Sequence, residues 1–327
     1  MKNIAVLMGG YSSEWEISIK SGNVVSSNLD RKIFTVYGIH ILEDGWFYED
    51  EKGSKHSIDK NDFSITVAGE KILFDCCYNT IHGTPGEDGK LQAYLELLNI
   101  PQTSCNSYVS GITFNKRDTI SIVRGRNIET AKNMFLNEGD NYDAQDIALQ
   151  LGLPCFVKAN RSGSSFGVSK VYETSEIEAA LAIAFKEDNE VLIESFLEGT
   201  EVSIGVYSLG NNIIVLPATE IVSENDFFDY EAKYLGKSEE ITPARISPAQ
   251  YEMLKDTTAR IYKYLNCKGI ARADFIFHQG RPHFVEINTN PGLSEASIVP
   301  KQIKHTGKTL KEVFTHIILD CIENHHA

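Results

Sequence analysis

Two runs of alternating apolar and polar residues, 272–277 and 284–288, restrict the possible folds more than any other part of this 327-residue chain. A Gln-Gly-Arg-Pro segment separates them, and Gly280 can take the backbone conformation that a tight turn requires. This pattern predicts a β-hairpin. The chain is therefore expected to contain an antiparallel sheet with one strongly polar face.

The polar positions of this hairpin predict a cation site. If the turn centres on Gly280, Asp274 lies opposite Glu286 and Arg272 opposite Asn288, all on one face. Two facing carboxylates repel unless a cation lies between them. Their oxygens and an amide oxygen are hard ligands that suit Mg²⁺. A solvated polar face is the alternative, and a one-residue slip would change every cross-strand pair; four functional residues on one face favour the metal.

The first hundred residues predict an open α/β sheet, because strand and helix signals alternate there. Short aromatic or β-branched runs between glycines in 43–70 predict hairpins added to this sheet. The expected strands cover 4–8, 34–41 and 72–77, and the expected helix covers 14–28.

The rest of the chain predicts two further units. A helix over 108–124 and strands over 156–160 and 168–172 form a small α+β unit. From Val191 onward, long strand runs predict a largely antiparallel sheet, and the polar connection 223–243 has the length of a lid. These runs cover 191–196, 202–209, 213–222, 269–277 and 282–288, with helices over 249–265 and 309–323.

A glycine- and serine-rich turn between the strands of the small unit predicts a phosphate-binding flap. Gly163, Ser164, Ser165 and Gly167 offer successive backbone N–H groups to phosphate oxygens. The segment is no Walker loop, because its lysine precedes the turn and a strand follows. A plain connecting turn is the alternative. Lys116, Lys158 and Lys233 each offer a charge to a polyphosphate, although a lone lysine is more often solvated.

Composition limits the class of protein. Hydrophobic residues make up 42% and charged residues 23% of the chain, which is typical of a globular protein. A net charge of −14 disfavours nucleic acids and anionic membranes as partners. Six cysteines without framework or CxxC spacing predict reduced, buried thiols. The N-terminal residues lack the features of a signal peptide, so a cytoplasmic location is expected.

Seven motifs in a fixed order resemble the ATP-grasp superfamily and, within it, the D-alanine:D-alanine ligase family. The resemblance runs nearly end to end. The motifs are Gly9-Gly10-Tyr-Ser-Ser-Glu14-x-Glu-Ile-Ser, His82-Gly-Thr-Pro-Gly-Glu-Asp-Gly, Lys158 with Gly163-Ser-Ser, Glu194-x-x-x-x-Gly-x-Glu201, Tyr230-Glu-Ala-Lys233-Tyr234, Arg272-x-Asp274 and Glu286-x-Asn288-Thr-x-Pro-Gly292.

The resemblance implies an ATP-grasp fold of three domains. Residues 1–103 are expected to form an N-terminal open α/β, Rossmann-like domain that binds substrate. Residues 104–194 are expected to form the central α+β domain with the flap. Residues 195–327 are expected to form the C-terminal domain with its largely antiparallel sheet, the metal site and the lid 223–243.

The resemblance also implies roles for individual residues. ATP is bound by Lys116, Lys158, Ser164, Ser165, the run Glu194, Ser195, Phe196 and Leu197, Glu201 and Lys233. Asp274, Glu286 and Asn288 bind two Mg²⁺ ions, with Mn²⁺ as a possible substitute. Glu14 binds the ammonium of the first D-alanine, His82 lies beside it, Arg272 and Gly292 bind the oxyanion, and Ser297 binds the second carboxylate. Ser164 and Tyr234 close the lid with Glu14.

The implied reaction joins two D-alanines through an acyl phosphate, for peptidoglycan precursors, in a homodimeric enzyme. Another ATP-grasp carboxylate–amine ligase and a non-catalytic nucleotide-binding protein remain alternatives. A nicotinamide dehydrogenase is disfavoured, because Gly9-Gly10 lacks the remainder of the GxGxxG fingerprint. Tyr234 favours an amine over a hydroxyl nucleophile.

Three residues depart from the family pattern. Trp15 stands where histidine or arginine is usual, Ala159 where proline is usual, and Asn115 where aspartate often precedes the lysine. The size of the Trp15 indole is expected to affect the first amino-acid pocket.

Overall fold

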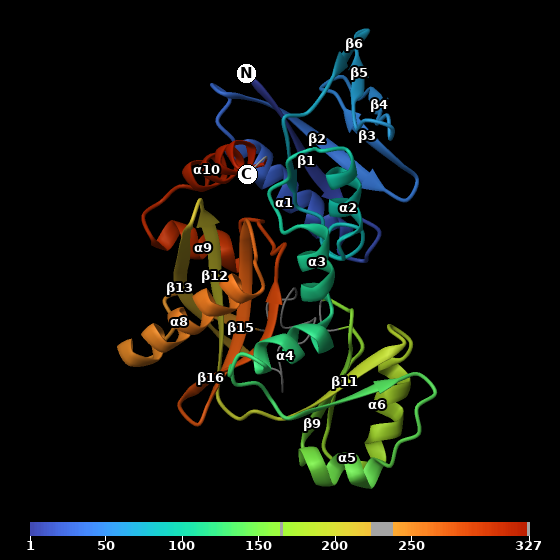
Figure 1. Cartoon of the computed structure of the whole chain (residues 1–327), viewed down its shortest axis with the longest axis vertical. Helices are drawn as coiled ribbons and strands as arrows, with labels where there is room; N and C mark the ends of the chain where they lie inside the picture. Colours follow the sequence, from blue (N-terminus) through green and yellow to red (C-terminus); the bar gives the residue numbers. More distant parts are fainter. Residues whose placement is uncertain (164–165, 224–237, 326–327) are drawn as a thin grey trace.

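The computed structural model describes residues 1–163, 166–223 and 238–325, and it arranges most strands in three sheets (Figure 1). The sheets follow one another along the chain. In Figure 1 the first is at the top, the third at the left and the second at the lower right, and both chain ends lie near the first sheet. The predicted α/β and α+β character is confirmed. The domain boundaries after residues 103 and 194 remain a prediction.

The first sheet has the order β4-β3-β2-β1-β7, in which β1 pairs in parallel with β2 and β7. The expected hairpins are present as β3–β4 and as the separate β5–β6 pair. The strand expected over 72–77 is wrong, because β6 ends at Ile72 and β7 begins at Cys76. The bounds are β1 Lys2–Gly9, β2 Phe34–Leu42, β3 Gly45–Glu49, β4 Lys55–Ser57, β5 Ile65–Val67, β6 Glu70–Ile72, β7 Cys76–Asn79, α1 Trp15–Asn28 and α2 Lys90–Leu97.

The second sheet is antiparallel, with the order β10-β9-β11-β8. Its strand β11 lies in the run 191–196, which the sequence grouped with the later antiparallel strands. That grouping is wrong, since β11 pairs with β8 and β9. The bounds are β8 Asn133–Asn137, β9 Cys155–Ala159, β10 Val168–Val171, β11 Glu190–Ser195, α5 Ala144–Leu151, a 3₁₀ turn Thr174–Glu176 and α6 Ile177–Ala184.

The third sheet is also antiparallel, with the order β14-β13-β12-β15-β16, as expected from its long strand runs. Residues 238–241 of the expected lid are instead strand β14, which pairs with β13. Most of that lid, 224–237, lies outside the described residues. The bounds are β12 Thr200–Leu209, β13 Asn212–Ser223, β14 Ser238–Ile241, β15 Ile270–His278, β16 Arg281–Asn288, α8 Pro248–Tyr264, α9 Ile298–His305 and α10 Leu310–Glu323.

The helix expected over 108–124 is divided in two, α3 Ser107–Phe114 and α4 Lys116–Arg124. Asn115 lies between them with an extended backbone (φ −92°, ψ 103°). Its side chain accepts a hydrogen bond from the backbone N–H of Asp118 and caps α4. An apolar period alone does not reveal such a break, because asparagine is tolerated inside a helix and favoured at its start.

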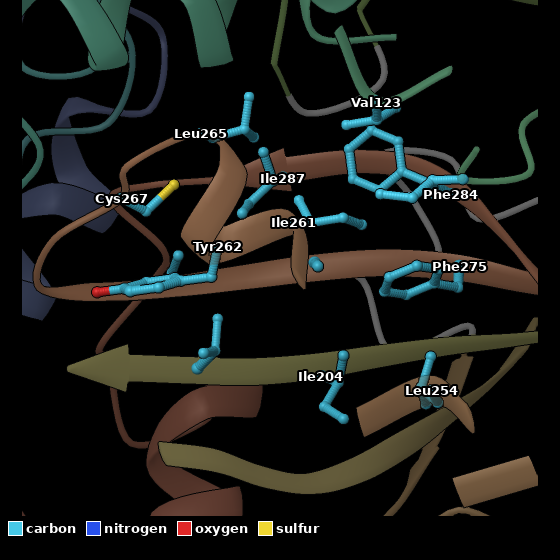
Figure 2. Close-up of a cluster of buried hydrophobic side chains, with 14 of the residues drawn as sticks. Val123, Ile204, Leu254, Ile261, Tyr262, Leu265, Cys267, Phe275, Phe284 and Ile287 are labelled. Atoms are coloured by element: carbon cyan, nitrogen blue, oxygen red, sulfur yellow. The ribbon is translucent and has the colours of Figure 1, made fainter. Parts of the chain in front are cut away.

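Two buried clusters connect the helices to the sheets. Figure 2 shows the cluster in which Leu254 and Ile261 of α8 and Val123 of α4 pack on the third sheet, next to Phe275 and Phe284. A second cluster joins the C-terminal helix α10 to the first sheet, where the ring of Phe314 packs edge-on against Tyr78 at 5.5 Å.

The cysteines are free thiols, as expected. Five are buried and Cys321 is partly exposed. In the described part of the chain, no helix is long and apolar enough to cross a membrane.

Candidate active site

Strands of the third sheet and the segments that follow strands of the first and second sheets line one cleft of about 370 Å³. It is the place where eight of the predicted site residues meet, although they come from positions almost three hundred residues apart. The eight are Glu14, His82, Lys116, Arg272, Glu286, Asn288, Gly292 and Ser297.

Glu14 enters the cleft from the turn between β1 and α1. The buried Ser18 hydroxyl accepts a hydrogen bond from the Gly9 amide at 2.8 Å and holds the start of α1 against the end of β1. Glu14 occupies the N-cap position, yet its side chain does not cap the helix. A Cβ added to Gly163 would lie 2.9 Å from Glu14 Oε2. The carboxylate therefore faces the beginning of the predicted phosphate flap.

His82 is buried in the wall of the cleft and joins two parts of the chain. Its Nδ1 lies 3.1 Å from the Asn290 carbonyl, and its Nε2 lies 3.3 Å from the Ser21 hydroxyl. Burial lowers the pKa of His82, and the nearby Glu14 charge only partly opposes this effect. A neutral ring that donates from Nδ1 to the carbonyl fits these contacts.

Glu87 also lines the cleft, and the sequence analysis gave it no role although it lies in the His82 motif. Its Oε2 accepts a hydrogen bond from the Gly83 amide at 2.6 Å. Burial, followed by the charge of Glu14, raises the pKa of Glu87 from its ordinary value of 4.5 to about 8. The cleft thus contains a carboxyl group that is mostly protonated at neutral pH.

The hairpin places Asp274 opposite Glu286 and Arg272 opposite Asn288, so the predicted pairs are confirmed. The turn itself differs from the expectation, because Gln279 and Gly280 form a two-residue turn with positive φ at both positions. That turn alone would shift the pairs by one residue. A register shift between Asp274 and Phe275 compensates for it.

Protein cations already lie beside both carboxylates of the hairpin. Arg272 forms a bidentate ion pair with Asp274, with 2.8 Å between Nη2 and Oδ2, and Ser203 donates to Asp274 Oδ1. Lys116 Nζ lies 3.5 Å from Glu286 Oε2. The facing carboxylates are therefore partly neutralised by the protein itself, a solution that the sequence analysis did not consider.

The donor set of the hairpin nevertheless suits a hard divalent cation. Asp274 and Glu286 offer carboxylate oxygens, and the Asn288 amide oxygen accepts one hydrogen bond from the Asn290 amide and keeps a second lone pair. Among the described residues, no group of three His, Cys, Asp or Glu side chains forms a metal cluster. A metal here would depend on two carboxylates and one amide.

The loop after the hairpin brings Gly292 against the start of α9. A Cβ at Gly292 would lie 2.8 Å from Ser297 Oγ, so glycine allows this close approach. The Ser297 and Ser294 hydroxyls are 2.8 Å apart, and Ser297 occupies the N-cap of α9 without a side-chain cap bond. Hydroxyls and the positive end of a helix dipole thus face one end of the cleft.

Lys158, Glu194 and Glu201 do not line this cleft but form a second group in the second and third sheets. Lys158 Nζ lies 2.8 Å from Glu194 Oε2, between strands β9 and β11. Burial alone would lower the pKa of Lys158, but the charges of Glu194, Glu286 and Glu201 outweigh it and raise the value. These charges connect the second group electrostatically to the hairpin of the cleft.

The segment expected to read adenine follows directly after β11. The amide of Ser195 donates to the Lys132 carbonyl at 2.9 Å, and that of Phe196 donates to the Pro154 carbonyl at 3.3 Å. Leu197 is the next residue. Ser164, Ser165, Lys233 and Tyr234 lie outside the described residues, so their placement remains a prediction.

Helix α1 lines the cleft with Ile17 and Lys20 rather than with Trp15, which is 42% exposed. Trp15 is therefore not among the described residues that line this cleft. Positions 14, 17 and 20 recur every three residues and share one helix face, whereas position 15 is turned away. This periodicity would have identified both lining residues from the sequence.

Two family models match most of the chain. The model described as D-ala D-ala ligase N-terminus matches residues 3–105, and the model described as D-ala D-ala ligase C-terminus matches residues 122–319. The chain belongs to the D-alanine–D-alanine ligase family.

Curated members of the family resemble the chain over nearly its full length. The D-alanine–D-alanine ligase of Flavobacterium johnsoniae is 53% identical over 97% of this chain and 98% of its own length. That of Christiangramia forsetii is 54% identical over 96% of both chains.

Solved structures share the fold. D-alanyl-alanine synthetase A of Vibrio cholerae matches with a TM-score of 0.89 at 27% identity, over 99% of both chains. The D-Ala:D-Ser ligase VanG of Enterococcus faecalis gives 0.86 at 31% identity, over 99% of both chains. The ATP complex of the Bacillus anthracis D-alanine–D-alanine ligase gives 0.77 at 27% identity, over 99% of this chain and 97% of that one. The predicted ATP-grasp architecture is confirmed.

Proposed function

We propose that this protein uses ATP to join two D-alanine molecules into D-alanyl-D-alanine, the dipeptide of peptidoglycan precursors. One observation carries the proposal: a single cleft presents the Glu14 carboxylate together with Arg272, Gly292 and Ser297. This set offers an anion for an ammonium group, a cation for a reacting carboxylate, and hydroxyl groups for a second carboxylate.

The donor D-alanine is held between Glu14 and Arg272. Glu14 binds its ammonium group, and burial beside His82 excludes water from that end. Arg272 and the Gly292 backbone stabilise the charge that develops on the carboxyl oxygen when it is phosphorylated and then attacked. The ion pair with Asp274 holds the Arg272 guanidinium in position.

ATP binds between the second and third sheets and donates its γ-phosphoryl group to the donor carboxylate. Lys116 and Lys158 carry the charge that compensates the phosphates, and the Lys158–Glu194 pair fixes one of them. The backbone of Ser195, Phe196 and Leu197 reads adenine and Glu201 binds ribose. Phosphorylation converts a poor acyl donor into one with a phosphate leaving group.

Asp274, Glu286 and Asn288 hold the magnesium ions that accompany ATP. When bound, two Mg²⁺ ions, or Mn²⁺ in their place, neutralise the phosphate oxygens of the nucleotide. Because Lys116 lies 3.5 Å from Glu286, this lysine and the metal compensate overlapping charges.

The acceptor D-alanine presents its amine to the acyl phosphate and its carboxylate to Ser297. Attack of the amine forms the peptide bond and releases phosphate. Ser164, Tyr234 and Lys233 complete the site in this proposal, with Ser164 and Tyr234 joined to Glu14. The amine rather than a hydroxyl is the nucleophile.

Domain division, location in the cell and oligomeric state are part of the proposed function. The three sheets correspond to three domains with boundaries near residues 103 and 194, and the enzyme is a cytoplasmic homodimer. Light scattering on the purified full chain measures the mass of the assembly and separates a dimer from a monomer.

The test is ADP formation in a coupled assay with Mg-ATP and D-alanine, with the product identified by its mass. L-alanine, D-lactate and no substrate serve as controls. D-alanine alone should stimulate ADP formation and yield D-alanyl-D-alanine. If D-alanine does not stimulate turnover, the substrate assignment is wrong.

A second amino acid as acceptor is the alternative that one comparison favours, because VanG is described as a D-Ala:D-Ser ligase. Mixed D-alanine and D-serine in the same assay distinguish the two by product mass. We expect D-alanyl-D-alanine to predominate.

A further inference from the structure

The described part of the cleft contains a cation, Lys20, that the roles above leave unused. Among the described residues that line it, the lysine and arginine side chains are those of Lys20, Lys116 and Arg272. Lys116 is paired with Glu286 and Arg272 with Asp274. Among the residues that the structure describes, Lys20 forms no ion pair with a carboxylate and no hydrogen bond. An unpaired ammonium group in a cleft favours an anionic ligand.

The position of Lys20 on α1 indicates which end of the substrates it faces. The next residue of the helix is the buried Ser21, whose hydroxyl accepts a hydrogen bond from the Leu293 amide at 3.1 Å. Leu293 directly follows Gly292 and precedes Ser294. The second turn of α1 therefore lies against the loop that carries the hydroxyls of Ser294 and Ser297.

The spacing along α1 matches the length of the product. Glu14 and Lys20 are six residues apart and line the same cleft, which separates them by about 9 Å along the helix axis. An extended dipeptide spans roughly 7 Å between its ammonium and carboxylate ends. The N-cap residue Glu14 and the exposed Lys20 of the second turn thus place an anion and a cation along the cleft at a separation that fits a zwitterionic dipeptide.

We propose that Lys20 binds the carboxylate of the acceptor D-alanine, together with the Ser294 and Ser297 hydroxyls and the N-terminus of α9. The inference rests on the proposed ligase function and extends it. Lys20 acts as a positioning and specificity residue: it selects acceptors that carry a carboxylate and directs their amine toward the acyl phosphate. It takes no part in proton or phosphoryl transfer.

The test is a competition between two acceptors in one reaction, D-alanine and D-alaninamide, which lacks the carboxylate. The mass spectrum gives the ratio of D-alanyl-D-alanine to its amide. This ratio is independent of enzyme concentration, ATP affinity, donor binding and partial unfolding. Lys20→Gln should lower the preference for D-alanine about tenfold, which corresponds to about 1.4 kcal/mol. Lys20→Arg should retain most of it.

Lys304→Gln is the matched control, because Lys304 is an exposed lysine of α9 that does not line the cleft. It should leave the ratio unchanged. An equal ratio in wild type and Lys20→Gln would overturn the inference. A change in Lys20→Gln that is confined to the KM for ATP would also overturn the inference, because Lys20 would then bind the nucleotide.

If neither the wild type nor any variant accepts D-alaninamide, the KM for D-alanine at the acceptor position decides whether Lys20 binds the carboxylate. Lys20→Gln should then raise it at least fivefold while the KM for ATP stays constant, and an unchanged value would refute the role of Lys20. Wild-type enzyme that makes no D-alanyl-D-alanine at all contradicts the proposed function itself. The two failures are therefore distinguishable.

Discussion

Glu87 is a partly buried acid whose ionisation opposes folding. Its pKa is raised from 4.5 to about 8, so the folded protein holds a proton that the unfolded chain has released. Its stabilising contribution is complete below about pH 4.5 and is lost as the pH rises toward about 8. Arg272 opposes the shift, whereas the charges of Glu14 and Glu286 increase it.

Glu87→Gln should remove this pH dependence. The glutamine oxygen can still accept the Gly83 hydrogen bond, and the amide cannot ionise. We expect the variant to gain stability relative to the wild type between about pH 4.5 and about pH 8. Urea unfolding across this range measures the difference. Parallel curves for the two proteins would show that Glu87 has an ordinary pKa.

Gly292 permits a contact that any side chain would disturb. Gly292→Ala should displace the Ser297 hydroxyl, which would lie 2.8 Å from the new Cβ, and raise the acceptor KM about tenfold. Steady-state kinetics and a thermal melt measure this effect. Gly45→Ala is the control, because no atom lies within 4 Å of a Cβ at Gly45. Equal acceptor KM values in both variants would contradict the steric argument.

At the scale of elements, the break between α3 and α4 positions Lys116, to which the proposed function assigns the phosphates of ATP. Asn115 caps α4, accepts a hydrogen bond from Asn160 at 2.9 Å, and places Lys116 in the first turn. Asn115→Ala should cost about 1 kcal/mol of stability. It should also raise the KM for ATP, because Lys116 loses its fixed position.

Asn106→Ala is the matched control, since Asn106 caps the start of α3 in the same manner. It should reduce stability by a similar amount without affecting the KM for ATP. Thermal melts and ATP titrations of both variants give the comparison. A change in the KM for ATP in both would mean that stability, not the position of Lys116, governs nucleotide binding.

The elements also show how far the sequence predicts this molecule. Alternation and motif order predicted the hairpin, its facing pairs and the antiparallel third sheet, because each depends on local periodicity. The strand pattern did not predict that β11 belongs to the second sheet, since that depends on pairing across a long sequence separation. Nor did it predict that Arg272 pairs with Asp274, since period two shows only that they share a face. The register at Asp274 was predicted correctly through two compensating differences, the two-residue turn and the bulge.

At the scale of the whole molecule, α10 connects the end of the chain to its beginning. Phe314 of α10 is fully buried in a cluster that contains residues of the first and third sheets. The ring of Tyr78 lies against it. The cleft contains Glu14 from the first hundred residues and Arg272 from the third sheet, so this core aligns the two sides. We expect the first and third sheets to unfold together for this reason.

Phe314→Ala should reduce the free energy of unfolding by about 3–5 kcal/mol and separate the unfolding of the two sheets. Hydrogen exchange measured by mass spectrometry should show faster exchange in both β1 and β12. Phe63→Ala is the matched control, because Phe63 is equally buried in a cluster confined to the first hundred residues. If α10 couples the two sheets, Phe63→Ala should accelerate the exchange of β1 and β12 by the same factor, because α10 is intact in this variant. Phe314→Ala should instead accelerate the two strands by different factors. Different factors in Phe63→Ala as well would mean that α10 is not what couples the two sides of the cleft.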